Sequence, residues 1–256
     1  MVKGLDLFKI HFEDFADHYV LIGGAACYLG MTEAGLDFRV TKDLDIVLCM
    51  EAEALDTVFV QAFWDFVRKG GYHNRQKSTG KKLFYRFYGP LNKDFPEMLE
   101  LFSRIPNALQ LHEDAHLTPI PVEDEASSLS AILLDDVYYR FIQECKGMTG
   151  GVTVVPPEGL IPLKAKAWLE LTRIYQAGKD LNQKDIKKHK NDMFRLFQII
   201  SQDMRMALPK PIAHDLSRFL ASVETDPPQS LKPFGLGNIQ VSEVIDTLRA
   251  IYELSL

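Results

Sequence analysis

Two aspartates spaced one residue apart, Asp43 and Asp45, constrain the fold of this chain more than any other feature. They begin a run that ends in Ile46, Val47 and Leu48, which predicts a strand of a buried sheet. Side chains alternate between the two faces of a strand, so both carboxylates project to the same side. Two like charges there weaken a strand unless a cation lies between them. A divalent metal, held by carboxylate oxygens and substrate phosphates, fits that place; a solvated strand start is the simpler alternative.

A second feature lies upstream, where the apolar run 19–22 is followed by Gly23, Gly24 and two alanines. Glycines at this point let backbone N–H groups approach a polyphosphate, and the N-terminus of a following helix favours negative charge. A tight strand–helix turn would explain the glycines alone. A phosphate cradle and a metal-binding pair within one segment together indicate phosphoryl or nucleotidyl transfer.

Gly23-Gly24 followed by Arg39-x-Thr41-x-Asp43-Leu-Asp45 resembles the signature of the polymerase-β-type nucleotidyltransferase superfamily. In particular it is similar to the branch of abortive-infection (AbiEii-like) toxins of bacterial type IV toxin–antitoxin systems. The resemblance covers residues 18 to about 50 and continues more loosely through 160–173 and 184–196. One departure concerns the last motif, where the family often has two neighbouring aspartates. Here Asp185 and Asp192 are two helical turns apart.

The resemblance implies an α/β (α+β) fold, a nucleotidyltransferase-type mixed sheet flanked by helices and followed by a C-terminal helical domain. It also implies an enzyme that moves a nucleoside monophosphate from an NTP to an acceptor hydroxyl on tRNA or protein. Mg²⁺, with Mn²⁺ as an alternative, is the expected cofactor, and an antitoxin is an expected partner. Asp43 and Asp45 would hold the metal, and a second metal would activate the hydroxyl.

Superfamily members usually bring a third carboxylate from a neighbouring strand, and the segment 96–103 offers Glu97 and Glu100. Glu100 is preferred, because it sits mid-strand between apolar residues where an unpaired charge would be costly. We expect it to be a metal ligand or the base that deprotonates the acceptor. The alternatives are a glutamate facing water on an edge strand, or one paired with Arg86.

Gly23, Gly24, Arg39 and Thr41 are the expected nucleotide-binding residues of the first half. Arg39 would clamp a phosphate or pair with Asp43. The Thr41 hydroxyl would orient a metal ligand, although a threonine at this place also simply favours a strand.

Lys166, Glu170 and Arg173 share one helical face in the second half. Lys166 is the expected catalytic lysine, reaching the β- and γ-phosphates, with Lys164 as the competing candidate. Arg173 is a further nucleotide-binding candidate. The alternative is a solvated stripe of ion pairs, each contributing only a few tenths of a kcal/mol.

Asp185, His189 and Asp192 line one face of the next helix. A histidine between two aspartates can bind metal, but imidazole is not a preferred ligand of Mg²⁺. Asp185 or Asp192 is therefore expected to anchor Lys166 or Arg173, and His189 to be structural or to contact the nucleotide. Asp185 is also a nucleotide-binding candidate. The lysines at 187, 188 and 190 either touch RNA or form a solvated face.

Hydrophobic periodicity and turn residues predict three parts: a catalytic domain over 1–125, a connecting segment over 126–159 that completes the sheet, and a helical domain over 160–256. The expected strands cover 19–22, 43–48, 81–88, 98–105, 129–134 and 152–155. The expected helices cover 5–15, 25 onward, 51–68, 135–145, 162–175, 184–202, 211–223 and 242–254. Asn182 and Ser242 are the expected caps of two of them.

Composition narrows the function classes. No run of about 18 apolar residues occurs, and no signal peptide begins the chain, which predicts a cytoplasmic protein without a membrane segment. The 3 cysteines are widely spaced and read as reduced core thiols. A net charge of −6 argues against a broadly basic nucleic-acid surface. Phosphate-loop, Ser-His-Asp and zinc patterns are absent, which disfavours kinases, hydrolases and zinc enzymes.

Two rival functions stay open. An antibiotic-type nucleotidyltransferase shares the aspartate pair but needs an acidic pocket for an aminoglycoside, whereas an RNA acceptor needs basic residues near the site. A catalytically degenerate fold kept as a binding module would bind no nucleotide.

Overall fold

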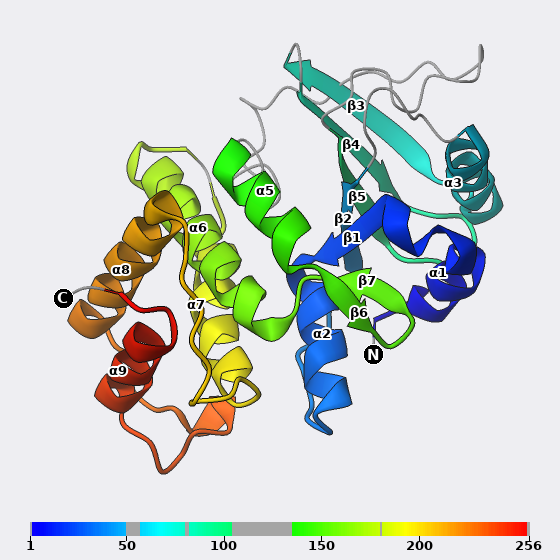
Figure 1. The fold of residues 1–256 in the computed structure, drawn as a ribbon. Coiled ribbons are helices and arrows are strands. Elements are labelled where there is room, and N and C mark those ends of the chain that lie inside the picture. The colour runs from blue at the N-terminus through cyan, green and yellow to red at the C-terminus, as the bar shows by residue number, and fades with distance from the viewer. Residues whose placement is uncertain (1, 50–56, 80–81, 104–134, 180, 255–256) are drawn as a thin grey trace. The chain divides into compact units, whose positions relative to one another are not determined.

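The computed structural model describes residues 2–49, 57–79, 82–103, 135–179 and 181–254. Their contacts form two compact units, one holding the strands and the first three helices, the other the later helices (Figure 1). The segment 126–159, expected to complete the sheet, divides between them. Residues 146–156 belong to the first unit, whereas the helix that ends at Cys145 belongs to the second.

The first unit is built on a mixed sheet with the strand order β3-β4-β5-β2-β1-β7-β6. Parallel pairing joins β2 to β5 and β1 to β7, and antiparallel pairing joins the other neighbours. The expected mixed α/β sheet with flanking helices is confirmed. The strands are β1 (Tyr19–Ile22), β2 (Asp43–Leu48), β3 (His73–Thr79), β4 (Lys82–Tyr88), β5 (Met98–Ser103), β6 (Gly147–Thr149) and β7 (Val152–Val154).

The central strands owe their place to their apolar residues. Every residue of β1 is buried, because strands pair on both of its sides and all four of its side chains are large and apolar. In β2, Leu44 and Ile46 are buried on one face, and Asp43 and Asp45 are only partly buried on the other. The sheet therefore presents the two aspartates on a single face, as the alternation predicted.

Strand β3 was not predicted. Its sequence, His-Asn-Arg-Gln-Lys-Ser-Thr, is wholly polar, and among the described strands it lies at one edge of the sheet and pairs with β4 alone. An edge strand needs no apolar alternation, because its backbone hydrogen bonds to one neighbour hold it in place. Strand β6, at the opposite edge, was missed for the same reason.

Helices α1 (Leu5–His11), α2 (Gly23–Glu33) and α3 (Thr57–Gly70) belong to this unit. Phe8 of α1 and Phe12, which caps its C-terminus, meet Phe66 of α3 with ring centroids 5.8 and 5.4 Å apart, so aromatic packing joins the two helices. Helix α1 ends earlier than expected and is followed by a 3₁₀ helix over Glu13–His18. Helix α2 begins at the glycines themselves rather than at residue 25.

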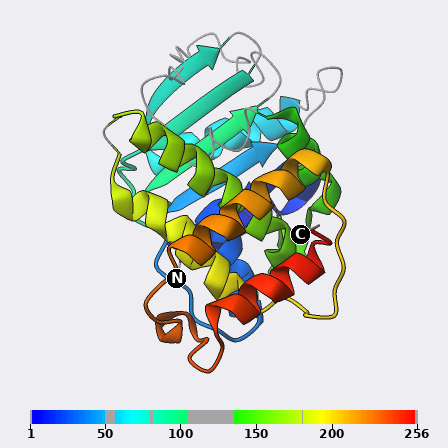
Figure 2. The ribbon, with the colours of Figure 1, turned by 90° about the vertical axis from the view of Figure 1, so that its left-hand side faces the viewer.

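The second unit is helical, as expected: α6 packs against α7 and α8, α8 against α9, and α5 against α6 and α8 (Figure 2). Its elements are α5 (Asp136–Cys145), α6 (Pro157–Gln176), α7 (Gln183–Phe197), α8 (Lys210–Thr225), the 3₁₀ turn Lys232–Phe234 and α9 (Val241–Ile251).

One predicted helix cap is confirmed and one is wrong. Asn182 accepts a hydrogen bond from the backbone N–H of Lys184 at 3.0 Å and caps α7. Ser242 lies inside α9, because the helix begins one residue earlier with a capping box. There the carboxylate of Glu243 accepts from the backbone N–H of Gln240 at 2.7 Å.

Helix α6 starts five residues before the expected start and contains Pro162. Proline has no N–H, so the carbonyl of Glu158 loses its helical hydrogen bond. The hydroxyl of Tyr252 donates to that carbonyl at 2.6 Å. Tyr252 is 1% exposed, and burial raises its pKa well above the usual value. Tyr252, just beyond the end of α9, thus supplies the hydrogen bond that the Glu158 carbonyl loses because of Pro162.

No helix in the described ranges is both long and apolar enough to cross a membrane. The predicted strand 129–134, the start of the helix predicted from residue 51 and the last two residues of the strand 98–105 lie outside these ranges.

We expect Tyr252→Phe to lower the free energy of unfolding by about 1–2 kcal/mol, because a buried carbonyl loses its donor. Pro162→Ala supplies a backbone N–H, so the cost of Tyr252→Phe should shrink in that background. Urea denaturation of the four proteins measures the coupling. Equal costs in both backgrounds would show that the tyrosine does not serve this carbonyl.

Candidate active site

The turn between β1 and α2 lies directly against the aspartate strand. Ile22 pairs with Asp45 across the antiparallel strands. A methyl group at Gly23 would lie 1.7 Å from Oδ2 of Asp45, and Gly23 has a φ of +69°. Only glycine suits both the backbone angle and this approach. The carboxylate therefore lies at the N-terminus of α2, where the helix dipole favours negative charge.

Gly24 is equally constrained, although by a different neighbour. A methyl group at Gly24 would lie 2.4 Å from Oγ1 of Thr41. Thr41 is 9% exposed, so its hydroxyl is enclosed between the turn and the beginning of β2. The structure thus brings together Gly23, Gly24, Thr41 and Asp45.

Asp43 and Glu100 join this group through the sheet. Asp43 precedes Asp45 by two residues on β2, and Asp45 pairs with Glu100 on the parallel strand β5. Paired residues of neighbouring strands project to the same face, so all three carboxylates share one face of the sheet. Glu100 thus lies on the strand beside β2, on the same face as the two aspartates.

Glu100 forms the ion pair with Arg86 that was one of its predicted alternatives. Nε of Arg86 donates to Oε1 of Glu100 at 2.8 Å, and a second guanidinium nitrogen donates to the same oxygen. Glu100 is 8% exposed. Oε2 accepts no hydrogen bond from the residues the structure describes. Glu97, the competing candidate, pairs with Lys42 at 3.1 Å.

Two carboxylates on this face of the sheet are suitable ligands for Mg²⁺. No set of three acidic, histidine or cysteine side chains in the described ranges is placed to hold a metal ion. Mg²⁺, however, commonly takes one or two carboxylates and completes its six ligands with water and substrate phosphates. Asp43 and Asp45 supply that number. Glu100 as a third ligand stays a prediction, because its Oε1 is engaged by Arg86.

Arg39, expected beside the aspartates, has its guanidinium carbon 5.2 Å from the centre of the Phe38 ring. This is a cation–π contact between sequence neighbours. Whether Arg39 contacts a phosphate stays a prediction.

Lys166, in the helical unit, lies in an ion-pair cluster. Its Nζ lies 3.0 Å from Oε1 of Glu170 and 3.3 Å from Oδ2 of Asp215, and 5.3 Å from the ring centre of Tyr138. Burial lowers the pKa of Lys166, but the hydrogen bond to Glu170 and the charge of Asp215 outweigh it and leave the pKa raised. The pair with Glu170 belongs to the ion-pair alternative, but the Lys166 side chain is 12% exposed rather than solvated and also pairs with α8 through Asp215.

Arg173 extends this cluster, with Nε 2.9 Å from Oε2 of Glu170, and its side chain is 72% exposed. Asp185 is exposed and pairs with Lys188 at 3.2 Å. Asp185 and Asp192 were expected to anchor Lys166 or Arg173. In the described part of the chain, neither aspartate forms an ion pair with Lys166 or Arg173. The nucleotide-binding roles of Arg173 and Asp185 stay predictions.

Lys164, the alternative to Lys166, is buried with Asp192 at 3.0 Å, the two side chains being 5% and 0% exposed. Arg195 adds a second cation 3.3 Å from the same carboxylate. His189, three residues before Asp192 on α7, is also buried. Breaking such a buried pair costs about 3–5 kcal/mol, so these residues hold α6 to α7.

Asp215 and Tyr138, which both contact Lys166, could not be identified from the sequence. The Tyr138 hydroxyl donates a hydrogen bond to Oδ2 of Asp215 at 3.1 Å. Neither stands in a motif, and both come from helices distant in sequence. Only the position of Asp215 on the partly buried side of the amphipathic helix α8 hinted at a buried partner.

Few known proteins are similar to this chain. No family model and no curated protein matches the chain. One similar solved structure is the crystal structure of an antigenic nucleotidyltransferase-like protein from Paracoccidioides brasiliensis. It is 14% identical, with a TM-score of 0.44, over 96% of this chain and 90% of that chain. A similarity this low does not transfer a function.

Gly23→Ala tests the contact between the turn and Asp45. Gly35→Ala is the matched control, because Gly35 has a φ of +73° but nothing within 4 Å of an added methyl group. We expect about 1–2 kcal/mol of destabilisation at Gly35, from backbone strain alone, and at least about 1 kcal/mol more at Gly23. Chemical denaturation measures both.

In an Asp45→Ala background the cost of Gly23→Ala should fall most of the way to that of Gly35→Ala, because the clashing carboxylate is gone and only the tight contact with Cβ of residue 45, at 3.2 Å, is left. A cost at Gly23 that does not depend on residue 45 would refute the contact.

Proposed function

We propose that the first unit catalyses Mg²⁺-dependent nucleotidyl transfer, moving a nucleoside monophosphate from an NTP to an acceptor hydroxyl with release of pyrophosphate. The contact of Asp45 with Gly23 supports this proposal most strongly. It places a carboxylate that can bind Mg²⁺ beside a glycine turn at a helix N-terminus that can bind phosphate. A bound polyphosphate needs both the metal and the turn.

The turn would bind the triphosphate. The space beside Gly23 and Gly24 is taken by Asp45 and Thr41, so the phosphate oxygens would bind the backbone N–H groups that point along the axis at the start of α2. The helix dipole adds a favourable field there. Thr41, enclosed against Gly24, would keep the turn in place.

Asp43 and Asp45 would hold Mg²⁺, or Mn²⁺ in its place. When bound, the metal supplies charge neutralisation at the attacked phosphate and fixes its orientation. The two carboxylates project from one strand in a central position of the sheet, so their spacing is set by the backbone rather than by flexible side chains.

Glu100 would accept the proton of the attacking hydroxyl. Arg86 holds Oε1 and thereby orients the carboxylate, which leaves Oε2 to face the acceptor. The acceptor's oxygen then attacks the α-phosphorus, the bond to the pyrophosphate breaks, and the proton resides on Glu100.

The finer parts of the proposal rest on the resemblance of the sequence motif. They are the roles of Lys166, Arg173 and Asp185 toward the nucleotide, a tRNA or protein acceptor, an antitoxin partner and a cytoplasmic location. An abortive-infection toxin of the AbiEii type is the specific version of this function.

A second candidate is a binding module that has lost catalysis. It is favoured by the structural use of two of the three carboxylates, since Asp45 packs on the turn and Glu100 pairs with Arg86. In this version the aspartates stabilise the start of α2 and bind no metal.

The test is transfer of label from α-labelled NTPs to total tRNA or protein in the presence of Mg²⁺. We expect Asp43→Asn combined with Asp45→Asn to reduce labelling at least about 100-fold, because metal-dependent charge stabilisation is lost. Circular dichroism should show an unchanged fold. Asp37→Asn is the control: it is exposed and removes a charge outside β2.

Undiminished labelling by the double variant would refute the assignment of the aspartates. If the native chain labels no acceptor and Mg²⁺ adds nothing to its binding of NTPs in calorimetry, the binding module is the correct reading.

A further inference from the structure

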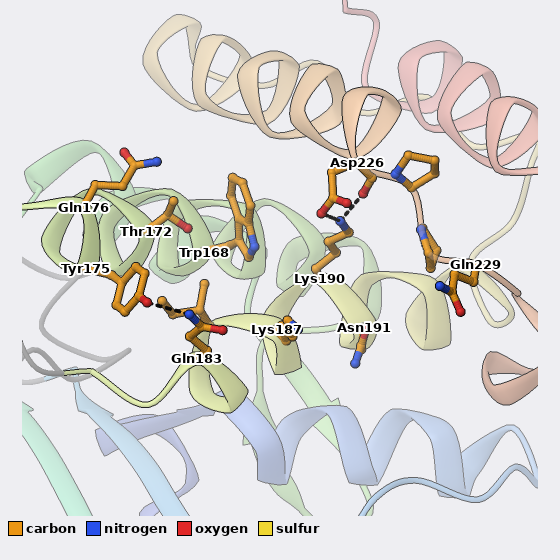
Figure 3. Close-up of a pocket in the computed structure, with 13 residues that line it drawn as sticks. Trp168, Thr172, Tyr175, Gln176, Gln183, Lys187, Lys190, Asn191, Asp226 and Gln229 are labelled. Carbon is orange, nitrogen blue, oxygen red and sulfur yellow. Dashed lines mark hydrogen bonds and ion pairs between the residues drawn. The ribbon is translucent and has the colours of Figure 1, made fainter.

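The helical unit contains a pocket that none of the candidate catalytic, metal-binding or nucleotide-binding residues of the preceding subsections lines, although Lys187 and Lys190 do. It lies between α6, α7 and the segment that follows α8, and has a volume of about 540 Å³ (Figure 3). Small-molecule sites typically measure about 300–1,000 Å³. All of its walls belong to the helical unit, so it exists independently of the aspartate face of the sheet.

One wall is a face of α6 that carries Trp168, Thr172 and Tyr175, at positions i, i+4 and i+7. Phe219 packs edge-on against Trp168, with ring centroids 5.4 Å apart, and so holds the indole in place. Tyr175 is 40% exposed, and Gln183 donates to its hydroxyl at 2.5 Å. This wall therefore offers two fixed, partly accessible aromatic rings (Figure 3).

Thr172 has a buried hydroxyl that makes no hydrogen bond within the described part of the chain. A helical threonine hydroxyl can donate to the carbonyl three or four residues earlier, and a buried hydroxyl without a partner is costly. Its position in the pocket wall makes a bound molecule the natural partner.

The opposite wall is a face of α7 that carries Lys187 and Lys190. Lys190 is committed to the protein, because its Nζ lies 3.0 Å from Oδ2 of Asp226 and also donates to the Asp226 carbonyl. That hydrogen bond lowers the pKa of Asp226. Lys187 is exposed and forms no hydrogen bond or ion pair with a described residue. Its charge also helps to lower the pKa of Asp226, whose carboxylate Lys190 holds, and the Lys187 ammonium remains available to a ligand.

These groups together select a ligand class. Aromatic rings suit a flat ring system, an ammonium suits an anion, and the amides of Gln183, Asn191 and Gln229 can both donate and accept. An apolar ligand would leave the Thr172 hydroxyl without a partner, and a bare anion would make no use of the rings. A nucleotide has a flat base with polar edges and a phosphate.

We propose that this pocket binds a nucleotide, with its base against Trp168, a polar group bonded to Thr172 and its phosphate at Lys187. The nucleotide is either a free mononucleotide or an unpaired nucleotide of an RNA strand, since stacking on aromatic rings beside basic residues serves both. The proposal does not depend on catalysis by the first unit.

The test is calorimetric titration of the full chain in EDTA with AMP, CMP, GMP and UMP, and with a single-stranded RNA tetranucleotide. EDTA removes metal-dependent binding at the aspartates. We expect Lys187→Ala to weaken binding about tenfold, through loss of a charge-assisted hydrogen bond. Trp168→Leu should weaken it by about the same factor, through loss of stacking.

Lys184→Ala is the matched control, because it removes the same charge from an exposed position of α7 outside the pocket. Its affinity should equal that of the native chain. Thr172→Val should weaken binding about threefold or more without lowering the melting temperature, because the free protein has no bond to lose there. An altered fold cannot explain that combination.

The two sources give different results. Equal affinity for a mononucleotide and for the tetranucleotide identifies a free nucleotide, and markedly tighter binding of the tetranucleotide identifies RNA. The proposal is overturned if neither binds at millimolar concentration, or if the pocket variants bind as well as Lys184→Ala. It is also overturned if inorganic phosphate or a glutamate-rich peptide binds as tightly as the nucleotides.

Discussion

The contact between the Asp45 carboxylate and Gly23 is the constraint on which the first unit depends. It fixes the start of α2 against β2, and a larger residue at either glycine would collide with Asp45 or Thr41. Because Asp45 also pairs with Ile22 and with Glu100, one residue links three strands and a helix. The same arrangement sets carboxylates beside the backbone N–H groups of a helix N-terminus. The N–H groups favour an anion such as phosphate, and the carboxylates favour its metal counterion.

Much of this site could be predicted from the sequence, because its parts are close together in the chain. The alternation within β2 places Asp43 and Asp45 on one face, and the glycines indicate a close approach. The partner of Glu100 could not be decided, since it depends on the register between β4 and β5, which the sequence leaves open. The contacts of Lys166 were equally hidden, because Asp215 lies 49 residues away on another helix.

The fold follows the same division. Apolar strands and amphipathic helices were predicted because burial leaves a periodic pattern. The polar edge strand β3 leaves none, and the start of α6 was missed because Pro162 suggested a helix start. The hydrogen bond from Tyr252 that makes this proline tolerable joins segments 94 residues apart. The helical pocket was not predicted either, although the i, i+4, i+7 spacing of Trp168, Thr172 and Tyr175 was visible in the sequence.

The most direct measurement of the central claim is a crystal structure with Mn²⁺ and a non-hydrolysable NTP, in which anomalous scattering locates the metal. The account predicts a metal about 2.0–2.2 Å from oxygens of Asp43 and Asp45, with the triphosphate at the backbone N–H groups that begin α2. A nucleotide bound elsewhere, with the Asp45 carboxylate still packed on Gly23 and no metal beside it, would contradict the account.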